Sequence, residues 1–280
     1  MTRPIALTIA GSDSSGGAGI QADLKTFSAL GVYGASVVTA LTAQNTTGVS
    51  DIHVPPADFT IAQLAAVTSD LRISATKTGM LPTDETVEAV ADIAVESRTA
   101  FGALIVDPVI VATSGDRLVS EAAVAALIKR LMPITTLLTP NIAEAAMLLG
   151  DKALATDDAA VVDQGRRLLS LGCAAVLMKG GHATSEDARD ILITAHGRQT
   201  FAAPRIPTPN THGTGCTLSA AITAELAKTE ASNQPSEPDE QTLSVAIAAA
   251  KDYLTAALQA GTSMNIGSGS GPVDHLVSWR

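Results

Sequence analysis

The chain contains very few aromatic residues and comparatively few basic ones. Aromatic side chains make up 2% of its 280 residues, and 18 Lys and Arg stand against 28 Asp and Glu, which gives a formal net charge of −10. Single-stranded nucleic acids are bound on aromatic stacking surfaces, and any nucleic acid requires clustered positive charge. Both shortages argue against a nucleic-acid partner, so an anionic ligand would have to be held by local groups.

Cysteines and long apolar runs are also scarce. Cys173 and Cys216 lie far apart in the sequence and show neither CxxC nor metal-ligand spacing, which favours a reducing compartment. No run of about 18 apolar residues occurs, and the apolar stretch near the N-terminus is shorter than the core of a signal peptide. We therefore expect a cytoplasmic protein that does not associate with membranes.

Apolar residues are abundant, and their pattern predicts an α/β fold. Hydrophobic residues make up 46% of the chain and charged residues 16%, which suits a sheet buried on both faces. Short apolar runs alternate with helical patterns, which predicts a mostly parallel sheet with helices on both sides. Strands are expected at Ile5–Ala10, Val37–Ala43, Ile73–Thr78, Leu104–Val106, Ile134–Leu138 and Ala174–Met178, and an antiparallel pair at Ile191–Ala195 and Gln199–Ala202.

We expect one domain over residues 1–280, with the Ser-, Pro- and Glu-rich segment 231–241 as a flexible surface loop. In an open parallel sheet, ligands bind beyond the carboxyl ends of the strands. Polar or small residues gather at or near those ends, namely Gly11, Asp23, Gln44, Lys77 to Met80, Asp107, Asn141, Glu144 and Lys179.

The stretch from Gly213 to Cys216 predicts an anion-binding cradle. Gly213 and Gly215 permit a turn with inward-pointing N–H groups, and the Ala-rich run that follows predicts a helix, whose N-terminus favours negative charge. Such groups would stabilise charge on a phosphoryl group in transfer. Cys216 lies in the first helical turn, where we expect the dipole to lower the pKa of the thiol. The alternative is a Gly-rich turn before a helix that buries its cysteine.

A second glycine pattern invites comparison with dehydrogenases. Gly17 to Ala22 matches GxGxxA, the dinucleotide-binding fingerprint. These glycines come well past the end of the first strand, however, and the next strand ends in Gln44 and not in an acid that would bind a ribose. No GxxxxGK(S/T) sequence is present either, so a kinase would need a different phosphate cradle.

Several segments together resemble the hydroxymethylpyrimidine/phosphomethylpyrimidine kinases of thiamine biosynthesis, a branch of the ribokinase-like superfamily. They run from Gly11 to Lys25, Ala40 to Thr46, Lys77 to Leu81, Asp107 to Val109, Leu138 to Asn141, Lys179 to His182 and Thr211 to Ser219. The resemblance covers nearly the whole chain, from Ile5 to His275. It implies a three-layer α/β/α sandwich and MgATP-dependent phosphorylation of a pyrimidine hydroxymethyl group, then of the monophosphate.

The resemblance also implies substrate-binding roles. Gln44 would bind the pyrimidine, and its amide offers both a donor and an acceptor to an aminopyrimidine edge; otherwise it is a polar residue at a strand end. Asp23 would hydrogen-bond the substrate, although a carboxylate on an apolar helix face can instead be a cap or a salt-bridge partner. Gly11 and Met80 would complete this side of the pocket.

On the phosphate side, Cys216 matches the position where most of the superfamily has Asp as the general base. The resemblance implies that Cys216 is the base here, but the identity of the base stays open, because a thiol needs a lowered pKa to act near neutral pH. Asn141 and Glu144 would contact phosphate and Mg²⁺, with Asp107 close by; the alternative is a helix cap and a solvated acid. Lys179 would neutralise ATP phosphates, unless it is simply a solvated lysine. Thr214, between the cradle glycines, is expected to contact the nucleotide.

Three other functions stay open at this point. Some members of the branch phosphorylate pyridoxal-type rings, so a pyridoxal kinase is the nearest alternative. A non-catalytic ligand-binding protein on the same fold and the dehydrogenase are the others, and the combination of cradle, Lys179 and Glu144 argues against both. A homodimer is an expectation from the family alone.

Overall fold

A computed structural model describes residues 3–111, 115, 117–180, 187–230 and 238–279. The expectations for His182 and for most of the 231–241 loop fall outside these residues. The expectation of a single domain over residues 1–280 stays a prediction.

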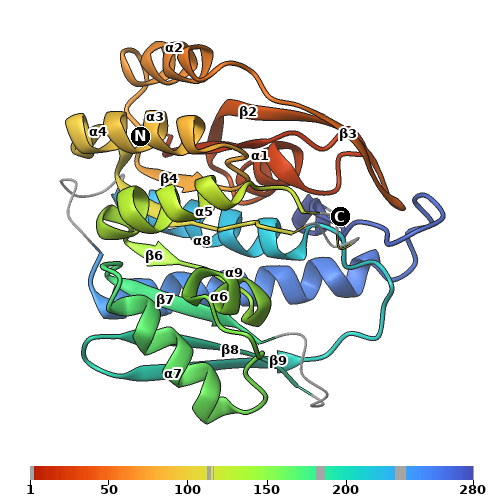
Figure 1. Ribbon diagram of the computed structural model, residues 1–280. Coiled ribbons are helices and arrows are strands. Elements are labelled where there is room, and N and C mark those ends of the chain that lie inside the picture. Colours follow the sequence, from red (N-terminus) through yellow and green to blue (C-terminus); the bar gives the residue numbers. More distant parts are fainter. Residues whose placement is uncertain (1–2, 112–114, 116, 181–186, 231–237, 280) are drawn as a thin grey trace.

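Within the described residues the strands form one nine-stranded sheet, ordered β3-β2-β1-β4-β5-β6-β7-β8-β9 (Figure 1). The strands from β2 to β7 in this order run parallel to one another, while β3, β8 and β9 are antiparallel to their neighbours. Their bounds are β1 Ile5–Gly11, β2 Tyr33–Asn45, β3 Gly48–His53, β4 Ala75–Thr78, β5 Ala103–Val106, β6 Leu137–Leu138, β7 Ala175–Lys179, β8 Asp187–Thr194 and β9 Arg198–Pro204.

Helices cover both faces of this sheet (Figure 1). One face packs against α1 (Gly19–Ala29), α8 (Thr214–Glu230) and α9 (Glu240–Gly261). The other carries α2 (Ala57–Thr68), α3 (Asp84–Glu96), the short α4 (Arg98–Phe101), α5 (Glu121–Ala126), α6 (Ile142–Leu149) and α7 (Asp158–Leu169). The predicted three-layer α/β/α sandwich is confirmed.

Strand β5 shows why its sequence belongs at the centre of such a sandwich. Leu104 and Val106 point into the hydrophobic core on the α3 side, whereas Ala103 and Ile105 point into the core on the α8 side. All four are essentially buried. A strand buried on both faces needs a continuous apolar run, and this is the pattern from which the parallel sheet was predicted.

The expected strands and helices are present, with differences at the edges. Thr83 caps α3 and Gly150 ends α6 in the left-handed conformation. Strand β3 was not expected, because its side chains are mostly polar or half-exposed and it pairs only along one edge with β2. Helix α9 begins at Glu240, inside the predicted loop, because the Asp239 side chain accepts a hydrogen bond from Thr242 N (2.8 Å) and caps it.

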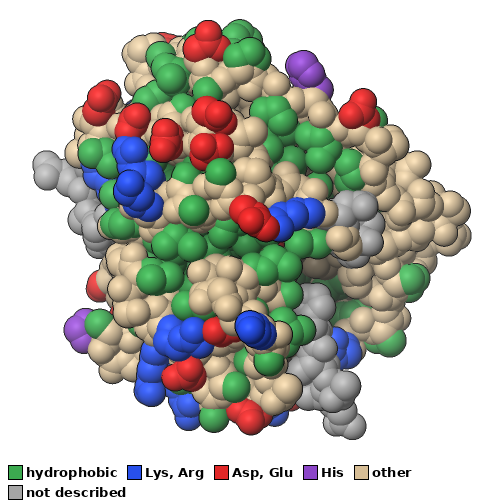
Figure 2. All heavy atoms as spheres, viewed as in Figure 1, with side chains coloured by type: hydrophobic (Ala, Val, Ile, Leu, Met, Phe, Trp, Pro, Cys, Tyr) green, Lys and Arg blue, Asp and Glu red, His purple; other side chains and the backbone are tan. Residues whose placement is uncertain are grey.

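None of the helices in the described part of the chain is both long enough and apolar enough to cross a lipid bilayer. On the face shown in Figure 2, acidic and basic side chains are interspersed among apolar ones. The acidic ones predominate over the α2–α3 region, which agrees with the negative net charge.

Candidate active site

The residues that follow β1, β5 and β6, together with Lys179 at the end of β7, converge on the N-terminus of α8, at the carboxyl ends of the parallel strands. Helix α8 packs against β1, β4 and β5 and against α1. Lys179, at the end of β7, forms an isolated bridge with Asn141 after β6. Most of the residues predicted for the phosphate side are therefore brought together where the sheet topology places a ligand site.

The cradle has the backbone that its glycines predict. Gly213 has φ +77°, and a Cβ added there would collide with the Gly17 carbonyl oxygen. Thr217 N donates to Gly213 O (2.8 Å), and α8 starts at Thr214. A Cβ added to Gly215 would lie 3.2 Å from Lys179 Nζ, so this lysine faces the first turn of α8. The N–H groups at the positive end of α8 and the ammonium group together form a site for an anion.

Lys179 is ion-paired and mostly buried, which excludes the solvated lysine. Its Nζ lies 2.8 Å from Asp107 Oδ1 and 3.9 Å from Glu144 Oε2. Burial acts to lower the pKa of Lys179, but the two carboxylates outweigh it and raise that pKa above its ordinary value. Asp107 also accepts a hydrogen bond from Ser219 Oγ on α8 (3.0 Å). The lysine stays charged beneath the cradle.

Asn141 and Glu144 form a capping box at the start of α6. The Asn141 side chain accepts from Glu144 N, and Glu144 Oε2 accepts from Asn141 N, both at 2.8 Å. The helix-cap alternative is thus present, but the solvated acid is wrong, because Glu144 is only 5% exposed. Burial raises the pKa of Glu144, opposed by Lys179. Among the described residues no group of three or more His, Cys, Asp or Glu could hold a metal ion by itself.

Asp23 is the partner of a buried lysine. Lys77 Nζ lies 2.7 and 2.8 Å from the two carboxylate oxygens of Asp23, and Thr8 Oγ1 donates to one of them at 2.6 Å. All three residues are fully buried. Against the effect of burial, Asp23 and nearby acidic groups raise the pKa of Lys77 above its ordinary value. The salt-bridge alternative is therefore present, and a hydrogen bond between Asp23 and the substrate stays a prediction.

The expected low pKa of Cys216 is also wrong. Burial raises the pKa of this thiol to about 11, although Lys77 and a hydrogen bond from the Gly19 backbone act to lower it. The helix N-terminus was correctly predicted, but burial is the largest influence on this thiol and disfavours the thiolate. The charge of Lys77 is matched by Asp23, and Asp23 acts to raise the pKa of Cys216, so the stabilisation of a thiolate by Lys77 is partly cancelled.

Gly11 and Met80 lie side by side, as expected for one wall of a pocket. A Cβ added to Gly11 would lie 3.2 Å from the Met80 sulfur. Gln44 is half-buried at a bulge in β2, where Thr42 Oγ1 donates to its side-chain oxygen (3.1 Å). Ser14 Oγ hydrogen-bonds both the N–H and the carbonyl of Gln44 (2.9 and 2.8 Å), which ties this residue to the loop between β1 and α1.

Asp13 and His212 were not assigned a role from the sequence. The Asp13 carboxylate accepts hydrogen bonds from Ser15, Gly17, Ala18 and His212. Burial acts to raise the pKa of Asp13, but these donors outweigh it and lower the pKa to about 2. An Asp before a Ser- and Gly-rich turn is a sequence signal for a turn of this kind. Nothing local signals a histidine partner 199 residues away.

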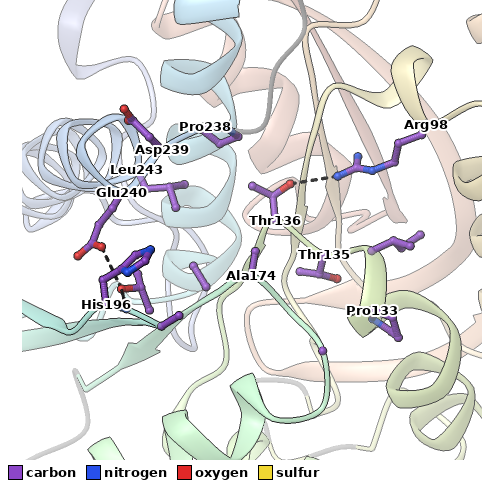
Figure 3. A pocket seen from close by; sticks show the side chains of 15 residues that line it. Arg98, Pro133, Thr135, Thr136, Ala174, His196, Pro238, Asp239, Glu240 and Leu243 are labelled. Carbon is purple, nitrogen blue, oxygen red and sulfur yellow. Dashed lines mark hydrogen bonds between the residues drawn. The ribbon is translucent and has the colours of Figure 1, made fainter.

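A hollow of about 450 Å³ lies elsewhere, at the opposite edge of the sheet (Figure 3). Its lining includes Arg98, Thr136, Ala174, His196 and Leu243, which come before β5, β6 and β7, between β8 and β9, and from the start of α9. None of the predicted site residues lines it. The candidate active site is therefore defined by converging side chains and not by this hollow.

Comparisons with known proteins agree with this arrangement. A family model described as phosphomethylpyrimidine kinase matches residues 13–274. The hydroxymethylpyrimidine/phosphomethylpyrimidine kinase of Escherichia coli (strain K12) is 50% identical over 279 residues and 100% of both chains. The crystal structure of phosphomethylpyrimidine kinase from Clostridium difficile 630 is 38% identical, with TM-score 0.76 over 91% of this chain and 100% of that one. An ADP complex of Bacillus subtilis pyridoxal kinase is 35% identical, with TM-score 0.84 over 98% of both.

Proposed function

Since the chain belongs to the phosphomethylpyrimidine kinase family, we propose that it phosphorylates 4-amino-5-hydroxymethyl-2-methylpyrimidine with ATP, and then phosphorylates the monophosphate, in thiamine biosynthesis. The observation that carries this proposal is the buried Lys179, held by Asp107 and Glu144 against the first turn of α8. Phosphoryl transfer depends mainly on positioning and on stabilising charge that is spread over phosphate oxygens. A lysine and a helix N-terminus facing one point supply that stabilisation.

The nucleotide phosphates would bind between Lys179 and the N–H groups of Gly213 to Cys216, with the Thr214 hydroxyl available as a further donor. Because the Asn141 side-chain oxygen is used by the capping box, its amide nitrogen is the group that would donate to a phosphate. The capping box of Asn141 and the Lys179–Asp107 ion pair hold these groups in place, and groups positioned in advance need little reorganisation during transfer.

Asp107 and Glu144 fit a Mg²⁺ ion that is bound together with the nucleotide. Mg²⁺ in kinases is commonly held by one or two carboxylates, substrate phosphates and water, and not by an all-protein cage. Two buried carboxylates beside one lysine match that donor set, and the lack of a larger acidic cluster among the described residues agrees with it. When bound, the ion would neutralise charge on the phosphate oxygens.

On the substrate side, Gln44 would pair with the aminopyrimidine edge, and Gly11 and Met80 would lie along the ring. Cys216 would accept the proton of the attacking hydroxyl. Only the thiolate form of Cys216 could do so, and because its pKa is about 11 that form is a small fraction at neutral pH, so we infer that the hydroxyl keeps its proton until the phosphoryl group has largely transferred. A loose transition state requires little prior deprotonation of the nucleophile.

The similarity to a pyridoxal kinase keeps that activity as the second candidate. The test is to incubate the protein with MgATP and, separately, the hydroxymethylpyrimidine, its monophosphate, pyridoxal and ribose. We expect the first two to have the highest kcat/KM, because a site built to hydrogen-bond an amino group discriminates strongly against rings that lack it. Gln44→Leu should raise KM for the pyrimidine more than for pyridoxal.

If pyridoxal were the better substrate and Gln44→Leu affected both alike, the kinase would stand but the pyrimidine preference would be wrong. Turnover of none of these rings would overturn the proposed function. A homodimer remains an expectation drawn from the family resemblance, and a cytoplasmic location remains one drawn from the scarcity of cysteines and of long apolar runs.

A further inference from the structure

Asp13 and His212 join two loops that reach the active site from opposite ends of the chain. Asp13 lies between β1 and α1, and His212 directly precedes Gly213. His212 Nε2 is 2.8 Å from Asp13 Oδ2, and only 1% of Asp13 and 7% of His212 are exposed. Hydrogen bonds to an ionised carboxylate are stronger than neutral ones, so this contact firmly connects the loops.

The same carboxylate also shapes its own loop. Oδ1 accepts from Ser15 N (2.9 Å) and Ser15 Oγ (2.7 Å), and Oδ2 accepts from Gly17 N (3.0 Å) and Ala18 N (2.8 Å). The His212 imidazole therefore contacts the group around which residues 13–18 are folded. A shift of the imidazole would be transmitted to the whole loop.

The two loops also touch through their backbones and leave little space. A Cβ on Gly17 would lie 2.5 Å from His212 Cδ2 and 3.1 Å from Pro272 Cβ, and one on Gly213 would collide with Gly17 O. His212 N donates to Gly271 O (3.0 Å), which fixes the histidine from behind. These close contacts set the separation of the two loops. Within the described residues, the Asp13–His212 pair is the one hydrogen bond between side chains that joins them.

Each loop leads directly to groups of the reaction. The loop of Asp13 carries Ser14, which holds Gln44, and it ends at Gly19, whose backbone acts to lower the pKa of Cys216. The loop of His212 continues into the cradle. One loop therefore belongs to the pyrimidine side of the site and the other to the phosphate side.

We propose that Asp13 and His212 are a positioning pair that sets the distance between the substrate-side loop, residues 12–18, and the phosphate cradle, Gly213 to Cys216. This inference rests on the proposed function. Neither side chain needs to touch a substrate. The pair affects the rate of phosphate transfer, since a misplacement of about 1 Å between reacting groups lowers the rate about 10²-fold.

The test compares three variants by steady-state kinetics and thermal unfolding. His212→Leu removes the donor, and kcat should fall about 10²-fold while KM for ATP and for the pyrimidine changes less than about threefold. His212→Gln places an amide donor at a similar reach and should keep kcat within about tenfold of the wild type. Lys25→Met is the control, because it removes a hydrogen bond to Gly16 O of the same loop (2.7 Å) without crossing to the cradle. It should behave as the wild type.

A second readout does not depend on turnover. Loosening the two loops should expose Cys216, so His212→Leu should speed its alkylation by iodoacetamide at pH 9 several-fold, and Lys25→Met should not. If the wild type phosphorylated no pyrimidine, the proposed function would be wrong. The alkylation rates of Cys216 in the two variants would still test whether Asp13 and His212 set the distance between the loops.

The proposed positioning role is refuted if His212→Leu keeps kcat within about threefold of the wild type, raises KM alone, or leaves the rate of Cys216 alkylation unchanged. Equal losses in Lys25→Met and His212→Leu would also refute it. If His212→Leu does not fold, His212→Gln decides: a folded His212→Gln protein with an inactive site would show that a donor at this place is not sufficient, against the proposal.

Discussion

Cys216 should be almost unreactive toward alkylating agents at neutral pH, although it lies at a helix N-terminus beside a lysine. The attacking species is the thiolate. With a pKa of about 11, about 10⁻⁴ of the thiol is ionised at pH 7, against about 3% for an ordinary cysteine with a pKa of about 8.5. From the ionised fraction alone, alkylation should be about 300-fold slower than for an exposed cysteine.

The assay is the rate of iodoacetamide modification of Cys216, followed by peptide mass spectrometry between pH 7 and pH 10. The rate should rise about tenfold per pH unit across this range without levelling. Cys173 serves as an internal reference, because burial in the core raises its pKa to about 12. The Cys216→Ala variant lacks this thiol and so identifies the modified peptide that belongs to Cys216.

A second arm tests the cause. Asp23→Asn would leave the buried Lys77 without its carboxylate, and the lysine would then stabilise a thiolate nearby, so the profile should shift to lower pH. A wild-type profile that levels off below about pH 8.5 would refute the reasoning that desolvation outweighs the helix dipole and Lys77.

Three further predictions concern activity and stability. Excess chelator should abolish phosphate transfer, because Asp107 and Glu144 supply only hard oxygen ligands suited to Mg²⁺; full activity in chelator would contradict this. Cys216→Ala should lower kcat at least about 10²-fold with little change in substrate binding, whereas Cys173→Ala should stay active, and a loss below about tenfold for Cys216→Ala would reassign the residue to packing. Burial lowers the pKa of His275 to about 4 in the folded protein, whereas the pKa of an unfolded histidine is about 6.5. The neutral His275 therefore contributes fully to the free energy of unfolding above about pH 6.5, and this contribution is lost as the pH falls toward 4. Urea unfolding should show about 2 kcal/mol less stability at pH 5 than at pH 7, and His275→Gln should remove this part of the difference; an unchanged difference would exclude His275 as its source.

Much of the fold could be predicted because its signals are local. The apolar run of β5, the Thr83 cap of α3 and the glycines of the cradle each depend on neighbours a few residues away. The rule for parallel sheets then placed Asp107 and Lys179 at one edge, and the structure joins them at 2.8 Å.

The partners of buried charges could not be predicted in the same way. The sequence shows that Asp23 needs compensation, but its partner Lys77 lies 54 residues further on and in another element. For Cys216, the sequence predicts the helix N-terminus but not how far the thiol is buried. The direction of its pKa shift was therefore predicted wrongly. Both cases concern desolvation, which depends on the packed structure and not on spacing.

Helix α8 has a consequence for how the molecule is made. It packs against β1, β4 and β5, whose residues all precede position 107, yet it begins only at Thr214. During synthesis, the part of this apolar face of the sheet that α1 does not cover must stay exposed until more than a hundred residues beyond β5 have been made. Such non-local closure slows folding and favours association between incomplete chains. The helix that completes the active site therefore also ends the period in which the nascent chain is most prone to aggregate.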